Sequence, residues 1–167
     1  MTTQLSDGLT LDMTYAIYGS ANEFGPEGGP RQLTPTVLKP KYEARAIFEL
    51  LQGAGTRIYP VAADLKRLGE AKVYASLADL PERVDALIVS LGKEHSRRAV
   101  EEAAAAGIPR LWFQMNTYSE EALSLCAAKG IKVIKGCALR HRTVTGLTRF
   151  ISPCFYMGLR ATKIPVR

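Results

Sequence analysis

The sequence contains no acidic residue after Glu121, although aspartate and glutamate together number 16 in the 167-residue chain. Basic residues continue through this last part: Lys129, Lys132, Lys135, Arg140, Arg142, Arg149, Arg160, Lys163 and Arg167. A basic end on a nearly neutral body favours an anionic partner, such as a nucleic acid, a membrane surface or a small phosphorylated ligand. The alternative is a solvated basic face.

Cysteines, histidines and long apolar runs are also scarce. Cys126, Cys137 and Cys154 are an odd number at wide spacing, which argues against a disulfide framework and a zinc site. His95 and His141 are too far apart in sequence to suggest a metal site. No apolar run approaches the roughly 18–20 residues of a membrane helix, and the N-terminal residues lack the basic start and apolar core of a secretory signal. We therefore expect a cytoplasmic protein of one domain, without a metal.

The clearest pattern lies in the middle of the chain. An apolar run at Val84–Val89 ends at Ser90–Gly92, a helical stretch continues to Ala106, and a second apolar run begins at Arg110. This order predicts a strand–helix–strand unit with parallel strands. The first run does not alternate with polar residues, which is typical of a strand covered on both faces. Ligands of such sheets bind at the carboxyl ends of the strands, so Ser90–Gly92 and Gln114–Asn116 are expected to line a site.

Similar patterns predict the other elements. Apolar runs predict strands at Met13–Gly19, Thr56–Val61, Lys72–Ala75 and Ile131–Gly136. Helical spacing predicts a helix from about Pro40 to Gly53, a turn within Asp64–Leu68, a helix from Ser119 to Gly130 and a short helix around Thr143–Phe150. Together they predict an α/β fold, a Rossmann-like doubly wound and mainly parallel five-stranded sheet with helices on both faces, plus a basic C-terminal extension. The expected strand order is 3-2-1-4-5.

The first loop, Gly19-Ser20-Ala21, follows the first predicted strand directly. Glycine there allows close approach of a ligand, and the following amides are able to bind an anion. A dinucleotide fingerprint needs further glycines running straight into a helix, whereas the next helix expected here begins at Pro40. An NAD site is therefore disfavoured, and a tight structural turn is the alternative to an anion site.

The order of segments from Tyr15 to Leu139 resembles a known family. The segments KVYASLADLPERVD and LWFQMN carry the most specific likeness, together with AIYGSA near the start and IKGCAL near the end. They resemble the stand-alone CoA-binding domains, which are similar to the nucleotide-binding domain of the succinyl-CoA synthetase alpha subunit. The resemblance implies a Rossmann-like domain over residues 1–139 that binds CoA or acyl-CoA at its strand ends. Residues 140–167 would be a basic extension packing on this domain or on a partner subunit.

The resemblance also implies roles for individual residues. The first loop would contact phosphate, the helix entry would flank it, the end of the second strand would border the adenosine, and the loop after the fourth strand would form the other wall. A glutamine after the tryptophan and a cysteine after the last strand complete the pattern. In this sequence these residues are Gly19, Ser20 and Ala21; Lys39, Pro40 and Tyr42; Tyr59, Pro60 and Val61; Leu91 and Gly92; Gln114; and Cys137.

The chain departs from the family pattern at several positions. The segment Asn22–Leu38 is enlarged, and Val61-Ala62-Ala63 replaces the usual Val-Asn-Pro, which removes a side-chain amide able to hydrogen-bond the nucleotide. Gly136 stands where relatives commonly carry arginine. The basic residues from Arg140 onward would either supply cations for the 3′-phosphate and diphosphate, or accompany a changed ligand.

No catalytic arrangement follows from the spacing of residues. His95 at a helix start is expected to cap or face solvent, and His141 lies between arginines whose charge opposes its protonation. Cys137 is either a buried inert thiol or a reactive one, if Lys135 or Arg140 lowers its pKa. We therefore expect a CoA or acyl-CoA binding protein that acts as a sensor, carrier or accessory module without catalysis of its own.

Two alternatives remain open at this point. One is an NAD(P)- or other nucleotide-dependent enzyme that uses the same crevice, with residues 22–38 as a lid. The other is an interaction through the basic end, where Phe150, Phe155 and Tyr156 alternate with Arg149 and Arg160. That pattern suits nucleic-acid stacking, and it suits a homodimer or partner-subunit contact, which we prefer.

Overall fold

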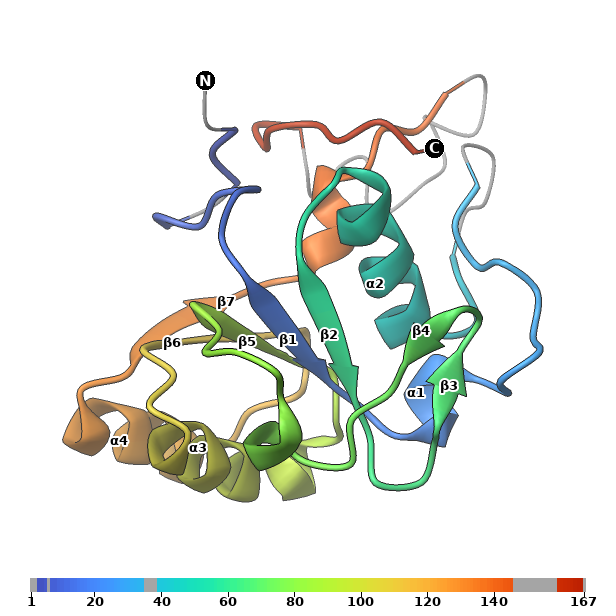
Figure 1. Cartoon of the computed structure of the whole chain (residues 1–167). Helices are drawn as coiled ribbons and strands as arrows, with labels where there is room; N and C mark the ends of the chain where they lie inside the picture. The colour runs from blue at the N-terminus through green and yellow to red at the C-terminus, as the bar shows by residue number, and fades with distance from the viewer. Residues whose placement is uncertain (1–2, 6, 35–38, 146–158, 167) are drawn as a thin grey trace.

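A parallel sheet of five strands runs through the centre of the computed structural model, which describes residues 3–5, 7–34, 39–145 and 159–166 (Figure 1). Its strand order is β2-β1-β5-β6-β7, and every neighbouring pair is parallel. The strands are β1 (Tyr15–Tyr18), β2 (Ile58–Val61), β5 (Ala86–Val89), β6 (Arg110–Phe113) and β7 (Lys132–Lys135). The predicted Rossmann-like sheet is confirmed.

The helices cover both faces of this sheet (Figure 1). Helix α2 (Glu43–Gly53) packs on one face, while α3 (Ser96–Ala105) and α4 (Glu120–Lys129) pack on the other. The predicted limits of α4 are confirmed, because the Ser119 hydroxyl accepts a hydrogen bond from the Ala122 amide and Gly130 ends the helix with φ +68°. Shorter elements are α1 (Ala21–Phe24), η1 (Leu77–Asp79), η2 (Lys93–His95) and η3 (Ala138–His141).

The five strands of this sheet follow the order 2-1-3-4-5 in sequence numbering. The segment predicted as the third strand, Lys72–Ala75, lies outside β2, where the expected order 3-2-1-4-5 places it, but it forms no full strand there. The chain leaves β2 through a small antiparallel hairpin, β3 (Arg67–Leu68) and β4 (Ala71–Lys72), where a helical turn had been expected. Tyr74 then makes an isolated parallel bridge with Val61 at the outer edge of β2. The segment predicted as the third strand therefore supplies one bridge beyond the edge, and the next full strand pairs on the other side of β1.

The face that carries α2 is completed by segments without helical structure. Leu9 and Ile164, each 1% exposed or less, belong to the same buried cluster as Trp112 and Ile134. Both chain ends accordingly lie at the same end of the molecule, at the top of Figure 1. Most of the short helix expected at residues 143–150 lies outside the described residues. None of the described helices has the length and apolar composition needed to cross a membrane.

Candidate functional site

The carboxyl ends of the five strands meet at one edge of the sheet, and we name this edge the strand-end crevice. It comprises the residues that follow each strand, together with the last residue of β2: Gly19–Ala21, Val61–Asp64, Ser90–Gly92, Gln114–Asn116 and Gly136–Cys137. Ligands of open parallel sheets bind at this edge, next to the point where the strand order reverses. Here the order reverses between β1 and β5.

Gly19 is required by close packing within the first loop. A Cβ at this position would lie 2.9 Å from the Phe24 ring, which is fully buried. The Gly19 amide donates to the Val61 carbonyl at 3.0 Å, so its N–H group is already bonded. This glycine thus has a structural reason to be present that involves no ligand.

A single helical turn, α1, follows the first loop directly, whereas no helix had been expected before Pro40. Ser20 and Glu23 form a capping box: the Ser20 hydroxyl accepts from the Asn22 amide at 3.2 Å, and the Glu23 carboxylate accepts from the Ser20 amide at 2.8 Å and from its hydroxyl. The spacing Ser-x-x-Glu was the sequence signal for this turn.

Two carboxylates accept hydrogen bonds from backbone amides of the first loop. Besides the contact of Glu23, the Asp64 Oδ1 accepts a hydrogen bond from the Ala21 amide at 2.9 Å. Asp64 comes three residues after the end of β2 and its side chain is exposed. Sequence reasoning missed this residue, although an acid just beyond the second strand of a Rossmann-like fold is a recognised signal.

The residues at the end of β2 are mostly buried or hydrogen-bonded to other parts of the chain. Val61 and Pro60 are buried, and the Tyr74 amide donates to the Pro60 carbonyl at 2.9 Å. The Tyr59 hydroxyl donates to Glu82 at 2.6 Å. The expected adenosine contact of these three β2 residues stays a prediction.

The entry to α2 lies against the enlarged loop. Lys39 is exposed and Pro40 is buried, while Tyr42 packs so closely on Gly25 that a Cβ there would lie 2.5 Å from the ring. The Tyr42 amide donates to Gln32 Oε1 at 3.3 Å. Part of the segment expected as a lid is therefore packed against the helix entry.

Arg45 anchors the same loop from inside α2. Its guanidinium is buried and donates to the carbonyls of Pro26 and Gly29 at 2.9 and 2.8 Å. Its neighbour Glu49, 3.4 Å from the Arg45 Nε, accepts from the amides of residues 32 and 33. Backbone polar groups of the loop are thus satisfied by one helical ion pair.

The loop after β5 forms the middle of the crevice. Leu91 and Gly92 are partly exposed, as expected for a wall residue and its neighbour. Close by, the first turns of α3 and α4 are joined by a 3.0 Å contact between the hydroxyls of Ser96 and Ser119. A hollow of about 390 Å³ lies over these two helix starts. His95 precedes α3 with a half-exposed side chain, in agreement with the expectation for this residue.

Gln114 and Cys137 are brought together at the ends of β6 and β7. Gln114 is 1% exposed, its Oε1 accepts from the Ala138 amide at 2.8 Å, and its Nε2 is buried without a hydrogen-bond partner among the described residues. The Cys137 thiol, 8% exposed, donates to Glu43 Oε1 at 3.6 Å. Burial raises the pKa of Glu43 above its usual value. This end of the crevice therefore contains an unsatisfied donor.

Cations surround the β7 end. Lys135 lies over the Tyr118 ring at 5.2 Å, and the Arg140 guanidinium approaches Gly136 so closely that a Cβ would lie 3.0 Å from it. Gly136 also has φ +133°, a conformation that side-chain-bearing residues rarely adopt. Burial first, then the charges of Arg140 and Lys163, lower the pKa of His141, so the predicted opposition to its protonation is confirmed in direction.

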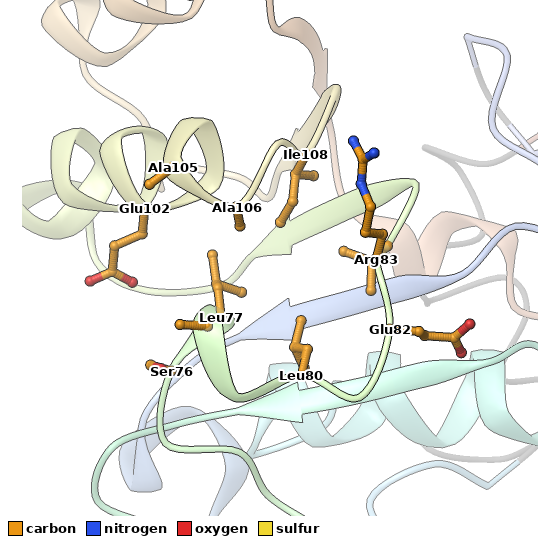
Figure 2. A pocket seen from close by; sticks show the side chains of 11 residues that line it. Ser76, Leu77, Leu80, Glu82, Arg83, Glu102, Ala105, Ala106 and Ile108 are labelled. Carbon is orange, nitrogen blue, oxygen red and sulfur yellow. The ribbon is translucent and has the colours of Figure 1, made fainter.

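A wide groove lies away from the crevice. It has a volume of about 610 Å³ and separates α3 from the segment that contains η1 (Figure 2). Leu77, Leu80 and Ile108 give it an apolar lining. Glu102 also lines this groove. Burial and the carboxylate of Glu102 raise the pKa of the neighbouring Tyr18 to about 12. None of the residues predicted to bind a ligand lines this groove.

Comparisons with known proteins agree with this architecture. A protein from Pyrococcus horikoshii OT3, described as hypothetical, is 24% identical with a TM-score of 0.63, and the match covers 83% of this chain and 93% of that one. A conserved hypothetical protein from Pyrococcus furiosus is 22% identical with a TM-score of 0.59, covering 74% and 92%. A Thermus thermophilus protein is 24% identical with a TM-score of 0.56, covering 75% and 84%. These likenesses show the fold.

The family comparison goes further than the fold. A family model described as a CoA binding domain matches residues 36–142, more than half of the chain. The matched range contains α2, the strands from β2 to β7 and both Gln114 and Cys137, whereas the first loop lies outside it. On this evidence the chain belongs to the family of CoA-binding domains.

Proposed function

We propose that the chain binds CoA or an acyl-CoA in the strand-end crevice and acts as a sensor, carrier or accessory subunit. The match of residues 36–142 to the CoA-binding family carries this proposal. The role is one of binding, since the side chains that favour a ligand are hydrogen-bond donors and cations. We assign no catalytic residue.

The β7 end fits the anionic parts of such a ligand. Arg140 brings a guanidinium beside Gly136, the position at which the resemblance places an arginine, and Lys135 lies one residue before it. Arginine and lysine are the usual partners of phosphate groups. The first loop fits phosphate poorly, because the amides of Ser20 and Ala21 already bond to carboxylates.

Gln114 supports a carbonyl-bearing ligand at the same end. Its buried Nε2 has no acceptor among the described residues, and an unsatisfied buried donor is costly. The amide and thioester carbonyls of an acyl-pantetheine arm are acceptors of the required kind. We propose that a small movement of the β6–β7 end, which exposes this donor, accompanies binding.

We infer that residues 1–139 form the binding domain and that residues 140–167 form an extension. Ile164 belongs to the buried cluster that contains Trp112 and Ile134, and the His141 ring lies 5.9 Å from the Trp112 ring, which supports packing of the extension on its own domain. A homodimer or a partner subunit would use surfaces beyond these contacts. Size-exclusion chromatography with light scattering measures whether a second copy is bound.

Isothermal titration of the purified chain with CoA and acetyl-CoA tests the function. We expect saturable binding, and a rise in melting temperature of several degrees at about a hundredfold excess over the dissociation constant. NAD and ATP serve as comparison ligands in the thermal titration. Absence of binding by either CoA compound up to millimolar concentration contradicts the proposal, and a shift with NAD alone would favour the dinucleotide enzyme instead.

A further inference from the structure

The first loop has no free amide to offer a phosphate. Four consecutive N–H groups are bonded within the chain: Gly19 to the Val61 carbonyl, Ser20 to the Glu23 carboxylate, Ala21 to the Asp64 carboxylate, and Asn22 to the Ser20 hydroxyl. Two of the four acceptors carry a negative charge. The protein's own carboxylates thus take the places that phosphate oxygens take in anion-binding loops.

Asp64 differs from Glu23 in its position. Glu23 belongs to the capping box of α1 and is tied to Ser20 by two contacts. Asp64 reaches the loop from the end of β2, 43 residues away in sequence, and makes a single contact through Oδ1. Its side chain is exposed, and no second hydrogen bond of this carboxylate occurs within the described parts of the chain. One carboxylate oxygen of this exposed side chain therefore has no hydrogen bond within the described residues.

An acid in this position has a definite chemical preference. In Rossmann-like sheets, an Asp or Glu beyond the second strand accepts hydrogen bonds from the hydroxyls of the adenosine ribose, and it disfavours a phosphate on that ribose. A carboxylate accepts from hydroxyls and repels phosphate, since both groups are negative. Ala62 and Ala63, which precede Asp64, offer neither a cation nor an amide side chain to compensate.

We propose that Asp64 selects, among pantetheine nucleotides, those whose adenosine ribose carries no phosphate. Dephospho-CoA and its acyl derivatives are the ligand class, and CoA itself binds more weakly. This inference rests on the proposed function, because it specifies which nucleotide the same crevice takes. Its second element is the orientation of the ligand. The adenosine lies at the end of β2, and the diphosphate and the pantetheine arm extend along the crevice toward Lys135 and Gln114.

Titration calorimetry with CoA and dephospho-CoA tests the selection on the full chain, in the wild type and in Asp64→Asn. Asparagine keeps an oxygen able to accept from the Ala21 amide and removes the charge, so the fold is retained. Glu70→Gln is the matched control, since this carboxylate is fully exposed at the tip of the β3–β4 hairpin. Circular dichroism checks that all three proteins are folded.

We expect the wild type and Glu70→Gln to bind dephospho-CoA about tenfold more tightly than CoA, the effect of one like-charge contact near a protein surface. Asp64→Asn should remove most of this difference by a gain in CoA affinity. Equal affinities in the wild type, a preference for CoA, or a ratio unchanged by Asp64→Asn overturns the selection and leaves the proposed function intact. If none of the three proteins binds either ligand, the selection and the proposed function are overturned together.

Discussion

The two ends of the strand-end crevice satisfy their polar groups in different ways. At the first-loop end, the amides of Ser20 and Ala21 are bonded to carboxylates of the chain itself. At the β7 end, the Gln114 Nε2 is buried without a partner among the described residues, and Lys135 places an ammonium group at the crevice margin. One end is internally complete and acidic, whereas the other is basic and contains a donor that a ligand would satisfy.

This difference shows that a shared fold does not fix which strand end holds the anion. The parallel sheet brings all five strand ends to one edge, but the charge along that edge depends on a few side chains in the loops. The match to the CoA-binding family covers the basic end and excludes the first loop. Of the two carboxylates at the acidic end, Glu23 therefore lies outside the matched range and Asp64 lies inside it.

Replacement of Arg45 by methionine should cause the largest loss of unfolding free energy, by removing the contacts that hold the loop after α1. The change leaves the Pro26 and Gly29 carbonyls and the Glu49 carboxylate without their buried guanidinium. Loss of one partner of a buried ion pair costs about 3 kcal/mol of unfolding free energy, measured by urea denaturation. Arg57→Met is the control, because its ion pair with Glu82 is exposed and contributes at most about 1 kcal/mol. Equal losses in both variants would show that the guanidinium does not support the loop.

Charge reversal at Lys135 should weaken the basic end. The Lys135→Glu variant is expected to lower CoA affinity by about tenfold or more, since one charge-assisted hydrogen bond contributes about 1.5–3 kcal/mol. Lys129→Glu is the matched control, because Lys129 is equally exposed but lies in the last turn of α4, at the opposite edge of the sheet. Calorimetric titration distinguishes the two sites. The same loss of CoA affinity in both variants would mean that CoA responds to the net charge of the protein and not to Lys135 itself.

The pH dependence of stability should reveal the environment of His141. Burial and the charges of Arg140 and Lys163 lower its pKa below the ordinary 6.5. Below about pH 6.5, His141 of the unfolded chain takes up a proton more readily than His141 of the folded chain. The stabilisation of the fold by the neutral imidazole is therefore complete above about pH 6.5 and is lost as the pH falls further. The urea concentration at the unfolding midpoint should fall more between about pH 7.5 and about pH 5.5 in the wild type than in His141→Gln.

The raised pKa of Glu43 acts in the opposite direction, since its folded form holds a proton more readily than the unfolded chain. Because Glu43 is present in both proteins, its effect cancels in the comparison with His141→Gln. Identical pH profiles for the two proteins would contradict the assignment to His141.

Glu23→Gln should have the smallest effect and sharpen the contrast of charge. Glutamine also completes a capping box, so the unfolding free energy is expected to change by only about 0.5 kcal/mol or less. CoA affinity should rise slightly, because one negative charge leaves the first loop while its hydrogen bond is kept. A large loss of stability would indicate that the charge itself, rather than the bond, holds α1.

The sequence sufficed for the elements whose signals are local. Ser119 and Gly130 marked the two ends of α4 by capping chemistry, and the unbroken apolar runs identified the buried strands. The turn of α1 also had a local signal, Ser20 and Glu23 at capping-box spacing, which was outweighed by the glycines and prolines that follow. Local hydrogen bonds of this kind are readable because both partners lie within one turn.

The contacts that decide the site were not readable in the same way. The bond from the Ala21 amide to Asp64 and the contact of Cys137 with Glu43 join residues 43 and 94 positions apart. The third predicted strand is reduced to one bridge for a similar reason, since residues 71–72 pair with residues 67–68 in the β3–β4 hairpin. Such features depend on which segments meet in space, and a single sequence does not specify these meetings.

The buried position of Ile164 has a consequence for how the chain reaches its final form during synthesis. Ile164 joins Leu139 and Trp112 in the interior, and its backbone bonds to residues 141 and 143. Domains usually begin to fold from the N-terminal side while the ribosome is still adding residues. The sheet face under residues 159–166 therefore stays exposed to water until that segment has emerged from the ribosome, so this face of the core is completed last.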